Sequence, residues 1–156
     1  FTDCLLQAGV KQVVGVDVGH NQLAESIRND PRVTFYEGIN ARALPQSLRS
    51  DHSPNGFDVV VMDVSFISQT LIYPALVPLM AEGGSLLSLV KPQFEVGRDG
   101  IGKGGIVRDN SLYERVRENI HEACQQHGLL VQDYFDSPIK GGDGNREFFV
   151  WAQKKS

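Results

Sequence analysis

Apolar runs of strand length recur along the whole chain, and helix-like stretches separate most of them. The runs lie at residues 11–18, 33–36, 57–63, 85–91, 129–135 and 147–153. A run that is apolar almost throughout, such as 57–63, is typical of a strand buried on both faces of a parallel sheet. A turn region without a helix joins the last two runs, so we expect those two strands to pair antiparallel.

Helical spacing is clearest between residues 111 and 128. Leu112, Val116 and Ile120 follow one another at four-residue intervals, so their side chains share one face of a helix. Ser111 is suited to cap the N-terminus of this helix, and Gly128 is suited to end it. Shorter helices are expected at residues 2–9, 21–29 and 68–81.

Turn-forming residues punctuate this pattern. Pro74 and Pro78 fall inside the expected helix 68–81, which should therefore be kinked or broken. Residues 49–56 are rich in turn formers and predict a surface loop, and Gly83-Gly84 predicts a turn before the next strand.

Strands that alternate with helices predict a doubly wound α/β sheet, mostly parallel with an antiparallel last strand. That ending is typical of the class I methyltransferase variant of the Rossmann fold. In such sheets the first strand is central and leads into a glycine-rich turn around the ligand, whereas this chain opens on the helix that should follow that strand. Because a missing central strand would leave unpaired backbone groups in the interior, we expect a fragment whose first strand lies upstream of Phe1.

The composition is that of an ordinary globular domain, with 41% hydrophobic and 22% charged residues, and we expect one domain over residues 1–156. No run approaches the roughly 20 apolar residues that span a bilayer, and no secretory signal opens the chain. Cys4 and Cys124 are too few and too far apart for a zinc site or a disulfide framework. We therefore expect a cytoplasmic protein with no membrane partner and no metal.

The formal net charge of −4 argues against nucleic-acid binding through a broad basic face. Arg98, Lys103 and Arg108 nevertheless lie in or beside a stretch with five glycines, residues 92–108. We interpret this stretch as a lid on the substrate side, and a disordered surface loop is the alternative. Phe66 is an aromatic residue that could stack on a base, although a lone phenylalanine is more often part of a core.

Three charged residues stand where apolar strands end. Asp63 closes the run at 57–63, Lys91 closes the run at 85–91, and Glu147 opens the last run. Such residues are costly in a core, and ligands of open α/β sheets bind in the crevice at the carboxyl ends of the strands. Glu147 reaches the same edge only if the last strand is antiparallel to the others. A solvated strand-end charge is the alternative for each residue alone, but three at one edge predict a site.

Asp63 and Lys91 have complementary chemistry. The carboxylate of Asp63 follows three valines and a methionine, so it is partly desolvated, and a nearby cation such as Lys91 would favour its charged form. A partly buried lysine has a destabilised ammonium group, which prepares it to accept a proton. Pro92 holds the backbone of Lys91 extended and gives it a rigid mount.

Two further positions are candidates for binding a nucleotide. Asp17 ends the first strand about where an acid binds the ribose hydroxyls of a dinucleotide or of S-adenosylmethionine, and an N-cap for the next helix is an equally good interpretation. Gly38, Ile39 and Asn40 follow the next strand, where an adenine ring lies in such folds. The amide of Asn40 could bind a base edge or simply form a turn.

Seven segments occur in a recognisable order and spacing. They are FTDCLLQAGV, VGVDVGHNQLAESIRNDPRV, EGINARAL, VMDVSFIS, LVKPQFEVGR, GGIVRD and GGDGNREFF. Together they resemble the hemolysin-A/TlyA-type proteins, which belong to the FtsJ-like rRNA ribose 2′-O-methyltransferases. The resemblance covers essentially the whole chain.

This resemblance implies methyl transfer from S-adenosyl-L-methionine to a ribose 2′-hydroxyl of ribosomal RNA, with cytidine as the nucleoside. It implies an upstream S4-like RNA-binding domain, which would bring an acidic domain to ribosomal RNA and ribosomal subunits. The implied cofactor-binding residues are Asp17, Val18, Gly38, Ile39, Asn40 and Asp63. For contacts with RNA, the local basic residues and the lone aromatic residue noted above remain the candidates: Phe66, Arg98, Lys103 and Arg108.

The resemblance also implies catalytic roles. FtsJ-like enzymes use a Lys-Asp-Lys-Glu set, and by motif its last three members fall on Asp63, Lys91 and Glu147. The first lysine would precede the expected upstream strand. A ribose hydroxyl is a poor nucleophile that needs a positioned base. We hypothesise that Lys91 is this base, that Asp63 orients it and tunes its basicity, and that Glu147 helps to hold the lysines.

Two other functions are alternatives. A cytolysin, as the older family name suggests, would need a spanning helix or a basic amphipathic helix, and the sequence predicts neither. A nicotinamide-dependent oxidoreductase would fit Asp17, but it would leave Asp63, Lys91 and Glu147 without a role.

Overall fold

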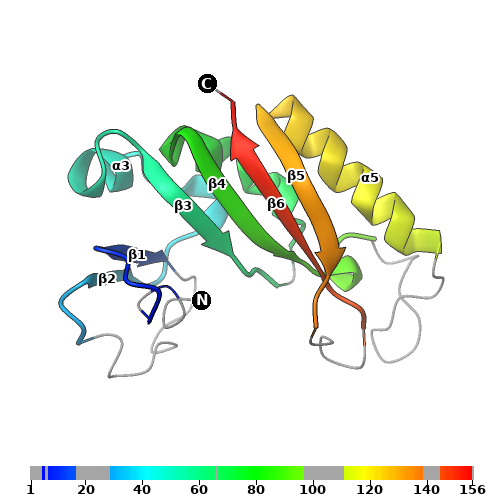
Figure 1. Cartoon of the computed structure of the whole chain (residues 1–156), viewed down its shortest axis with the longest axis horizontal. Coiled ribbons are helices and arrows are strands. Elements are labelled where there is room, and N and C mark those ends of the chain that lie inside the picture. Colours follow the sequence, from blue (N-terminus) through cyan, green and yellow to red (C-terminus); the bar gives the residue numbers. More distant parts are fainter. Residues whose placement is uncertain are drawn as a thin grey trace.

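The computed structural model describes residues 5, 7–16, 29–65, 67–96, 111–138 and 145–155. The apolar runs form strands in two sheets, a parallel pair β1-β2 and a four-stranded sheet of order β3-β4-β6-β5 (Figure 1). The strands are β1 (Val13–Val16), β2 (Val33–Tyr36), β3 (Phe57–Met62), β4 (Met80–Val90), β5 (Leu129–Asp136) and β6 (Phe148–Lys154). The predicted α/β class is therefore confirmed.

Strand directions bring three strand ends to one edge of the larger sheet. β3 and β4 are parallel, whereas β6 is antiparallel to both β4 and β5. Val90 at the end of β4 lies opposite Phe148 at the start of β6. The expected antiparallel pairing of the last two strands is confirmed. Because β6 is also antiparallel to β4, Glu147 at its start lies at the same sheet edge as Asp63 and Lys91.

β4 begins earlier than the sequence predicts. Gly83-Gly84 lies within this strand, in an irregular stretch, and does not form the expected turn before it. Phe57 pairs with Met80 while Val59 pairs with Ser85, so the extra residues of β4 bulge out and pairing with β3 resumes. The prediction was wrong because the local glycine signal marks a bulge as well as a turn.

The expected helix at 68–81 is broken, as its prolines predict. It consists of η2 (Gln69–Leu71), α4 (Tyr73–Leu76) and η3 (Val77–Leu79), and the strand β4 already begins at Met80. Each of the two later pieces has its proline at one of the first two helical positions, where the missing N–H donor does no harm.

A short helix replaces part of the loop expected at 49–56. α3 (Ser47–His52) is anchored by Leu48, which is 5% exposed, and Arg49 at its end donates to the carbonyl groups of Pro54 and Pro78. The loop prediction was wrong here because these long-range contacts override weak local helix propensity. A smaller turn, η1 (Ala41–Ala43), precedes this helix.

α5 (Ser111–Gln126) confirms the clearest helix prediction. Val116, Ile120 and Cys124 are its buried residues, and they join the main core cluster against the sheet. His127 and Gly128 follow the helix, and Gly128 has φ 76°, as a residue that ends a helix often does. Figure 1 shows α5 running beside β5 along one face of the four-stranded sheet.

Several expectations fall partly or wholly outside the described residues. Of the helix expected at 2–9, the structure describes Leu5 and residues 7–9: Leu5 and Gln7 are helical, residues 8 and 9 form a turn, and Gly9 has φ 88°. Most of the helix expected at 21–29 lies outside them, and so does most of the loop expected at 92–108. The described start of that loop is a short turn, η4 (Pro92–Phe94), which corrects the loop prediction for these residues.

Candidate active site

Lys91 and Asp63 form the centre of the candidate site. Lys91 follows β4 with extended backbone angles, φ −111° and ψ 95°, as expected before Pro92. Its Nζ lies 2.6 Å from Oδ1 of Asp63, which follows β3, and donates to Oγ of Ser65 at 2.9 Å. The Lys91 side chain is 15% exposed and the Asp63 side chain 46%. The ammonium is therefore shielded, whereas the carboxylate is accessible from solvent.

Glu147 lies at the same sheet edge but contacts a different residue. It directly precedes β6, is 8% exposed, and accepts a hydrogen bond from Nε2 of Gln93 at 3.1 Å between Oε2 and Nε2. The contacts of the described residues include no ion pair between Glu147 and Lys91. Its role in holding lysines remains a prediction.

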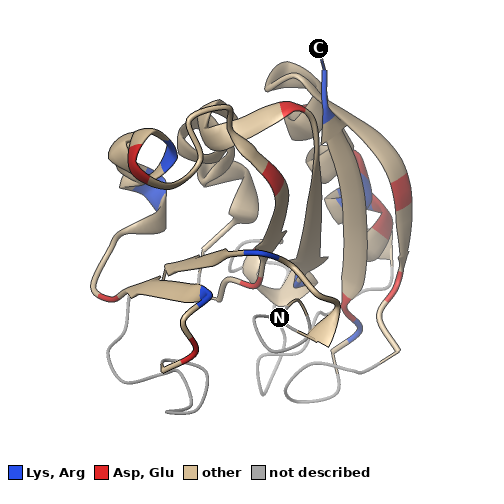
Figure 2. Cartoon of the chain, turned by 60° about the vertical axis from the view of Figure 1, so that its left-hand side comes forward, with Lys and Arg blue, Asp and Glu red and all other residues tan. Residues whose placement is uncertain are grey.

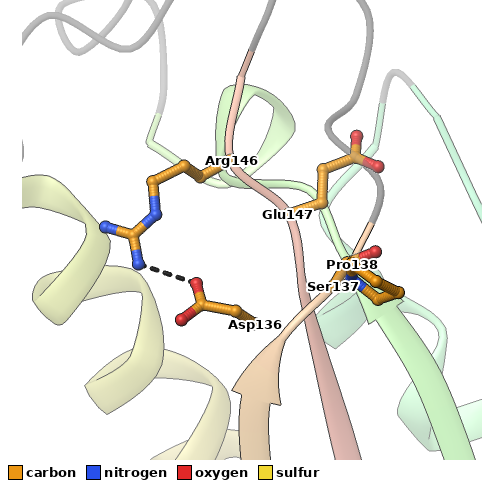
Figure 3. A pocket seen from close by; sticks show the side chains of 5 residues that line it. All are labelled: Asp136, Ser137, Pro138, Arg146 and Glu147. Atoms are coloured by element: carbon orange, nitrogen blue, oxygen red, sulfur yellow. Dashed lines mark hydrogen bonds and ion pairs between the residues drawn. The ribbon is translucent and has the colours of Figure 1, made fainter.

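A pocket of about 370 Å³ opens beside Glu147. It is lined by Asp136, Ser137, Pro138, Arg146 and Glu147 (Figure 3). Arg146 turns toward Asp136, with 2.7 Å between Nη2 and Oδ1, while Glu147 points to the other side of the strand. Arg146 also lies over the rings of Tyr113 and Phe148, so its guanidinium group is fixed by packing.

Glu95 is an acid in the same region that the sequence reasoning did not single out. It follows η4 and accepts hydrogen bonds from Ser68 Oγ at 2.5 Å and from the backbone N–H of Gln69 at 2.9 Å. Burial raises the pKa of its carboxyl group, and these two hydrogen bonds oppose that increase. Glu95 therefore caps η2 from across the site.

The described part of the proposed cofactor site is the segment after β2. Gly38 has φ 73°, a conformation that few other residues adopt, and it leads to Ile39 and Asn40. Oδ1 of Asn40 accepts from the N–H of Arg42 and caps η1, which matches the turn-forming alternative. This cap uses the amide oxygen, so the role of the amide nitrogen remains a prediction. Asp17 and Val18 lie outside the described residues.

The proposed RNA-binding residues Phe66, Arg98, Lys103 and Arg108 all lie outside the described residues. Over the described elements, acidic and basic residues are interspersed and do not form a continuous basic stretch (Figure 2). Within the same residues, no cluster of three or more His, Cys, Asp or Glu side chains is placed to hold a metal ion. None of the described helices has the length and apolar character needed to cross a membrane.

Sequence reasoning missed three residues that organise the site: Ser65, Gln93 and Glu95. A signal was available, because Lys91, Gln93 and Glu95 occupy alternate positions after a buried strand. The sequence could not show which partner each of them meets, since Gln93 and Glu147 are 54 positions apart.

The α/β topology, with an antiparallel last strand and charged residues at the carboxyl edge of the sheet, is that of a Rossmann-like methyltransferase. A comparison with family models identifies the family. The chain belongs to the FtsJ-like methyltransferase family, whose model matches residues 1–154.

Individual relatives agree with this family. The chain is 41% identical over 157 residues to TlyA of Mycobacterium tuberculosis, a 16S/23S rRNA (cytidine-2'-O)-methyltransferase. The alignment covers 100% of this chain and 57% of that protein. It is 44% identical over 151 residues to YqxC of Bacillus subtilis, named as a candidate rRNA methyltransferase, with 96% and 52% covered. The chain thus spans about half the length of these relatives.

A solved structure shares the same fold at similar identity. A Streptococcus thermophilus protein described as a candidate hemolysin superposes with a TM-score of 0.92 and 43% identity. The match covers 100% of this chain and 55% of that protein.

Proposed function

We propose that the protein containing this chain transfers a methyl group from S-adenosylmethionine to a ribose 2′-hydroxyl of ribosomal RNA, with cytidine as the nucleoside. The observation that carries the proposal is the contact between Lys91 Nζ and Asp63 Oδ1 at the edge of the sheet. Membership of the FtsJ-like methyltransferase family supports the reaction class. The name of the M. tuberculosis relative supports ribosomal RNA and cytidine as the substrate.

Lys91 is the proposed general base. Its Nζ is fixed by Asp63 and Ser65, so the position of a proton acceptor is set before substrate arrives. Lys91, in its neutral amine form, would accept the proton of the 2′-hydroxyl as the 2′-oxygen bonds to the methyl carbon and the carbon–sulfur bond of the sulfonium donor breaks, which leaves a neutral thioether. Asp63 keeps Nζ in place throughout and stabilises the ammonium ion that results. Glu147 is the proposed third member of the site.

The described residues fit the proposed cofactor. The carboxylate of Asp63 is accessible to solvent. In the segment after β2, Gly38 has no side chain to block a ligand, and Asn40 carries an amide group. These residues, with Asp17 and Val18, are proposed to hold S-adenosylmethionine. When bound, the cofactor would supply an electrophilic methyl group on a sulfonium ion. No metal ion is needed for this reaction.

Recognition of RNA is proposed to involve Phe66 by stacking, and Arg98, Lys103 and Arg108 by contacts with phosphates. An S4-like RNA-binding domain preceding residues 1–156 would add to the affinity. Ribosomal subunits are the proposed partners, and the cytoplasm is the proposed compartment.

The test uses the complete protein and ribosomal subunits from a strain that lacks its gene. Incubation with S-adenosylmethionine should produce 2′-O-methylcytidine, detected by mass spectrometry of nucleosides from the digested rRNA. Lys91→Ala should lower the rate at least about 100-fold because it removes the base, while the affinity for S-adenosylmethionine measured by calorimetry stays within a few fold. Lys155→Ala, at an exposed lysine beyond β6, is the matched control.

Unchanged methylation by Lys91→Ala would overturn the assignment of the base. Absence of 2′-O-methylation with the wild-type protein would overturn the function itself. Leakage of liposomes at low protein concentration would then favour the membrane-acting alternative, and binding of NAD in place of S-adenosylmethionine would favour an oxidoreductase.

A further inference from the structure

Glu95 is a half-buried acid whose environment is unusual. Both of its oxygens accept hydrogen bonds from the start of η2, one from Ser68 Oγ and one from the N–H of Gln69. The ion pairs among the described residues include no cation paired with Glu95. A partly desolvated carboxylate without a cation is costly, so its two hydrogen bonds have to compensate for this.

These hydrogen bonds fix one end of the segment that carries Asp63. The segment runs from Asp63 to Ser68 between β3 and η2, and all of it except Phe66 is described. At its beginning, Asp63 and Ser65 contact the ammonium of Lys91. At its end, Ser68 contacts Glu95. The two ends of this segment are therefore held by Lys91 and Glu95, which are only four positions apart in the sequence.

Gln93 lies between Lys91 and Glu95 in the sequence and contacts Glu147, the third charged residue of the site. Gln93 donates from Nε2 to Glu147, while its Oε1 is buried and has no partner among the described residues. The stretch from Lys91 to Glu95 thus contacts Asp63, Glu147 and the end of the segment that follows β3. This arrangement makes one short turn the frame of the whole site.

We propose that Glu95 is a positioning residue, which holds the segment from Asp63 to Ser68 so that Asp63 and Ser65 keep Nζ of Lys91 in its reactive place. The inference deepens the proposed methyl transfer and rests on it. Glu95 itself does not touch the reacting atoms in this scheme. It acts through the two hydrogen bonds to Ser68 and Gln69.

A purely structural role is the competing explanation, because an acid at a helix N-terminus also stabilises the fold. The two roles differ in what they change. A structural cap alters the fraction of folded protein and leaves the rate per folded molecule unchanged. A positioning residue alters kcat of the folded molecules, because small displacements of catalytic groups are costly in rate.

The experiment compares Glu95→Ala, Glu95→Gln and the exposed control Glu118→Ala in the complete protein. Glu95→Ala should lower kcat about tenfold or more per folded molecule, with KM for S-adenosylmethionine changed by less than about threefold. Glu95→Gln should stay within about threefold of wild type, because its amide oxygen can accept from Gln69 and its amide nitrogen can donate to Ser68 Oγ. The folded fraction is measured by circular dichroism.

Amide hydrogen exchange gives a second readout that does not depend on activity. In Glu95→Ala the N–H of Gln69 should exchange faster than in wild type, as should the peptide spanning the start of η2, while α5 is unchanged. If Glu95→Ala does not fold, Ser68→Ala removes the hydrogen bond from Ser68 Oγ to Glu95, together with the N-cap that Ser68 Oγ forms on the N–H of Thr70, and should change kcat and exchange in the same direction.

Wild-type kcat in Glu95→Ala would overturn the inference, and so would equal loss in Glu95→Ala and Glu95→Gln or unchanged exchange at Gln69. The proposed function fails separately, through absence of rRNA methylation by the wild-type protein. In that case the exchange measurement still decides whether Glu95 holds the segment.

Discussion

The buried hydroxyl groups of two tyrosines show how much a single partner matters. Tyr73 Oη donates to Oε1 of Gln69 at 2.7 Å, and Nε2 of Gln69 donates to the carbonyl of Leu89. Tyr134 Oη, in contrast, is buried without a hydrogen-bond partner among the described residues. Burial raises the pKa of both phenols, so both remain protonated at neutral pH.

Replacement of each tyrosine by phenylalanine should therefore have a different effect on stability. Tyr73→Phe leaves Oε1 of Gln69 buried without a donor and should lower the free energy of unfolding by about 1–3 kcal/mol. Tyr134→Phe removes a hydroxyl without a partner and should be neutral or stabilising. Urea denaturation of the two variants beside wild type measures both effects, and similar losses would contradict this account of the hydrogen bonds.

Glu95 predicts a pH dependence of stability. Because its pKa is raised in the folded chain, the folded state binds more protons than the unfolded state between the ordinary and the raised value. The stabilisation of the folded state that comes from protonation of Glu95 is therefore complete at lower pH, and it is lost as the pH rises through the raised pKa. Glu95→Gln should flatten this part of the stability profile, measured as urea midpoints across the mildly acidic range. An unchanged slope would rule out Glu95 as its source.

At the scale of elements, the irregular stretch of β4 depends on glycines with different constraints. Gly83 has φ 76° and open space around its missing side chain. Gly56, before β3, has φ 92°, and a Cβ atom there would lie 2.4 Å from the backbone nitrogen of Ala81. A side chain at position 83 would suffer only the strain of the left-handed backbone conformation. A side chain at position 56 would suffer that strain and would also overlap the backbone of Ala81.

Alanine substitutions should separate these two constraints. Gly83→Ala should lower the free energy of unfolding by about 1–2 kcal/mol, the strain of a left-handed conformation. Gly56→Ala should be clearly more destabilising, because β3 and β4 would have to move apart. Thermal unfolding of both variants tests the order, and equal losses would contradict it.

Element prediction from the sequence was accurate where the signal was periodic. The face of α5 with Val116 and Ile120 and the antiparallel end of the sheet follow from local patterns that tertiary structure reinforces. α3 and the early start of β4 were missed. Both depend on partners distant in sequence, such as the carbonyl of Pro78 for Arg49 and Phe57 for Met80.

At the scale of the whole molecule, the core is concentrated in one of the two sheets. The main cluster of buried residues draws on β3 to β6, α4 and α5, and none of its members lies in β1 or β2. β1 and β2 pair with each other in a separate sheet. Across the face opposite α5, the larger sheet leaves Leu130, Phe135 and Trp151 exposed.

This asymmetry predicts unequal local stability. Amides of β4 and β6 should exchange only through global unfolding, whereas those of β1 and β2 should exchange through smaller openings with lower free energy. Native-state hydrogen exchange of this chain at increasing denaturant tests the prediction. Equal exchange free energies in both sheets would show that they unfold as one unit.

The sequence by itself determined the type of the strongly periodic elements, the direction of the last strand and the sheet edge at which Asp63, Lys91 and Glu147 stand. Those features follow from hydrophobic periodicity and chain connectivity, which are local properties. Only the tertiary structure decided that Ser65 joins Asp63 at Lys91, that Glu147 meets Gln93, and that Glu95 caps η2. Such contacts depend on strand register and side-chain direction, which are set by packing across the whole domain.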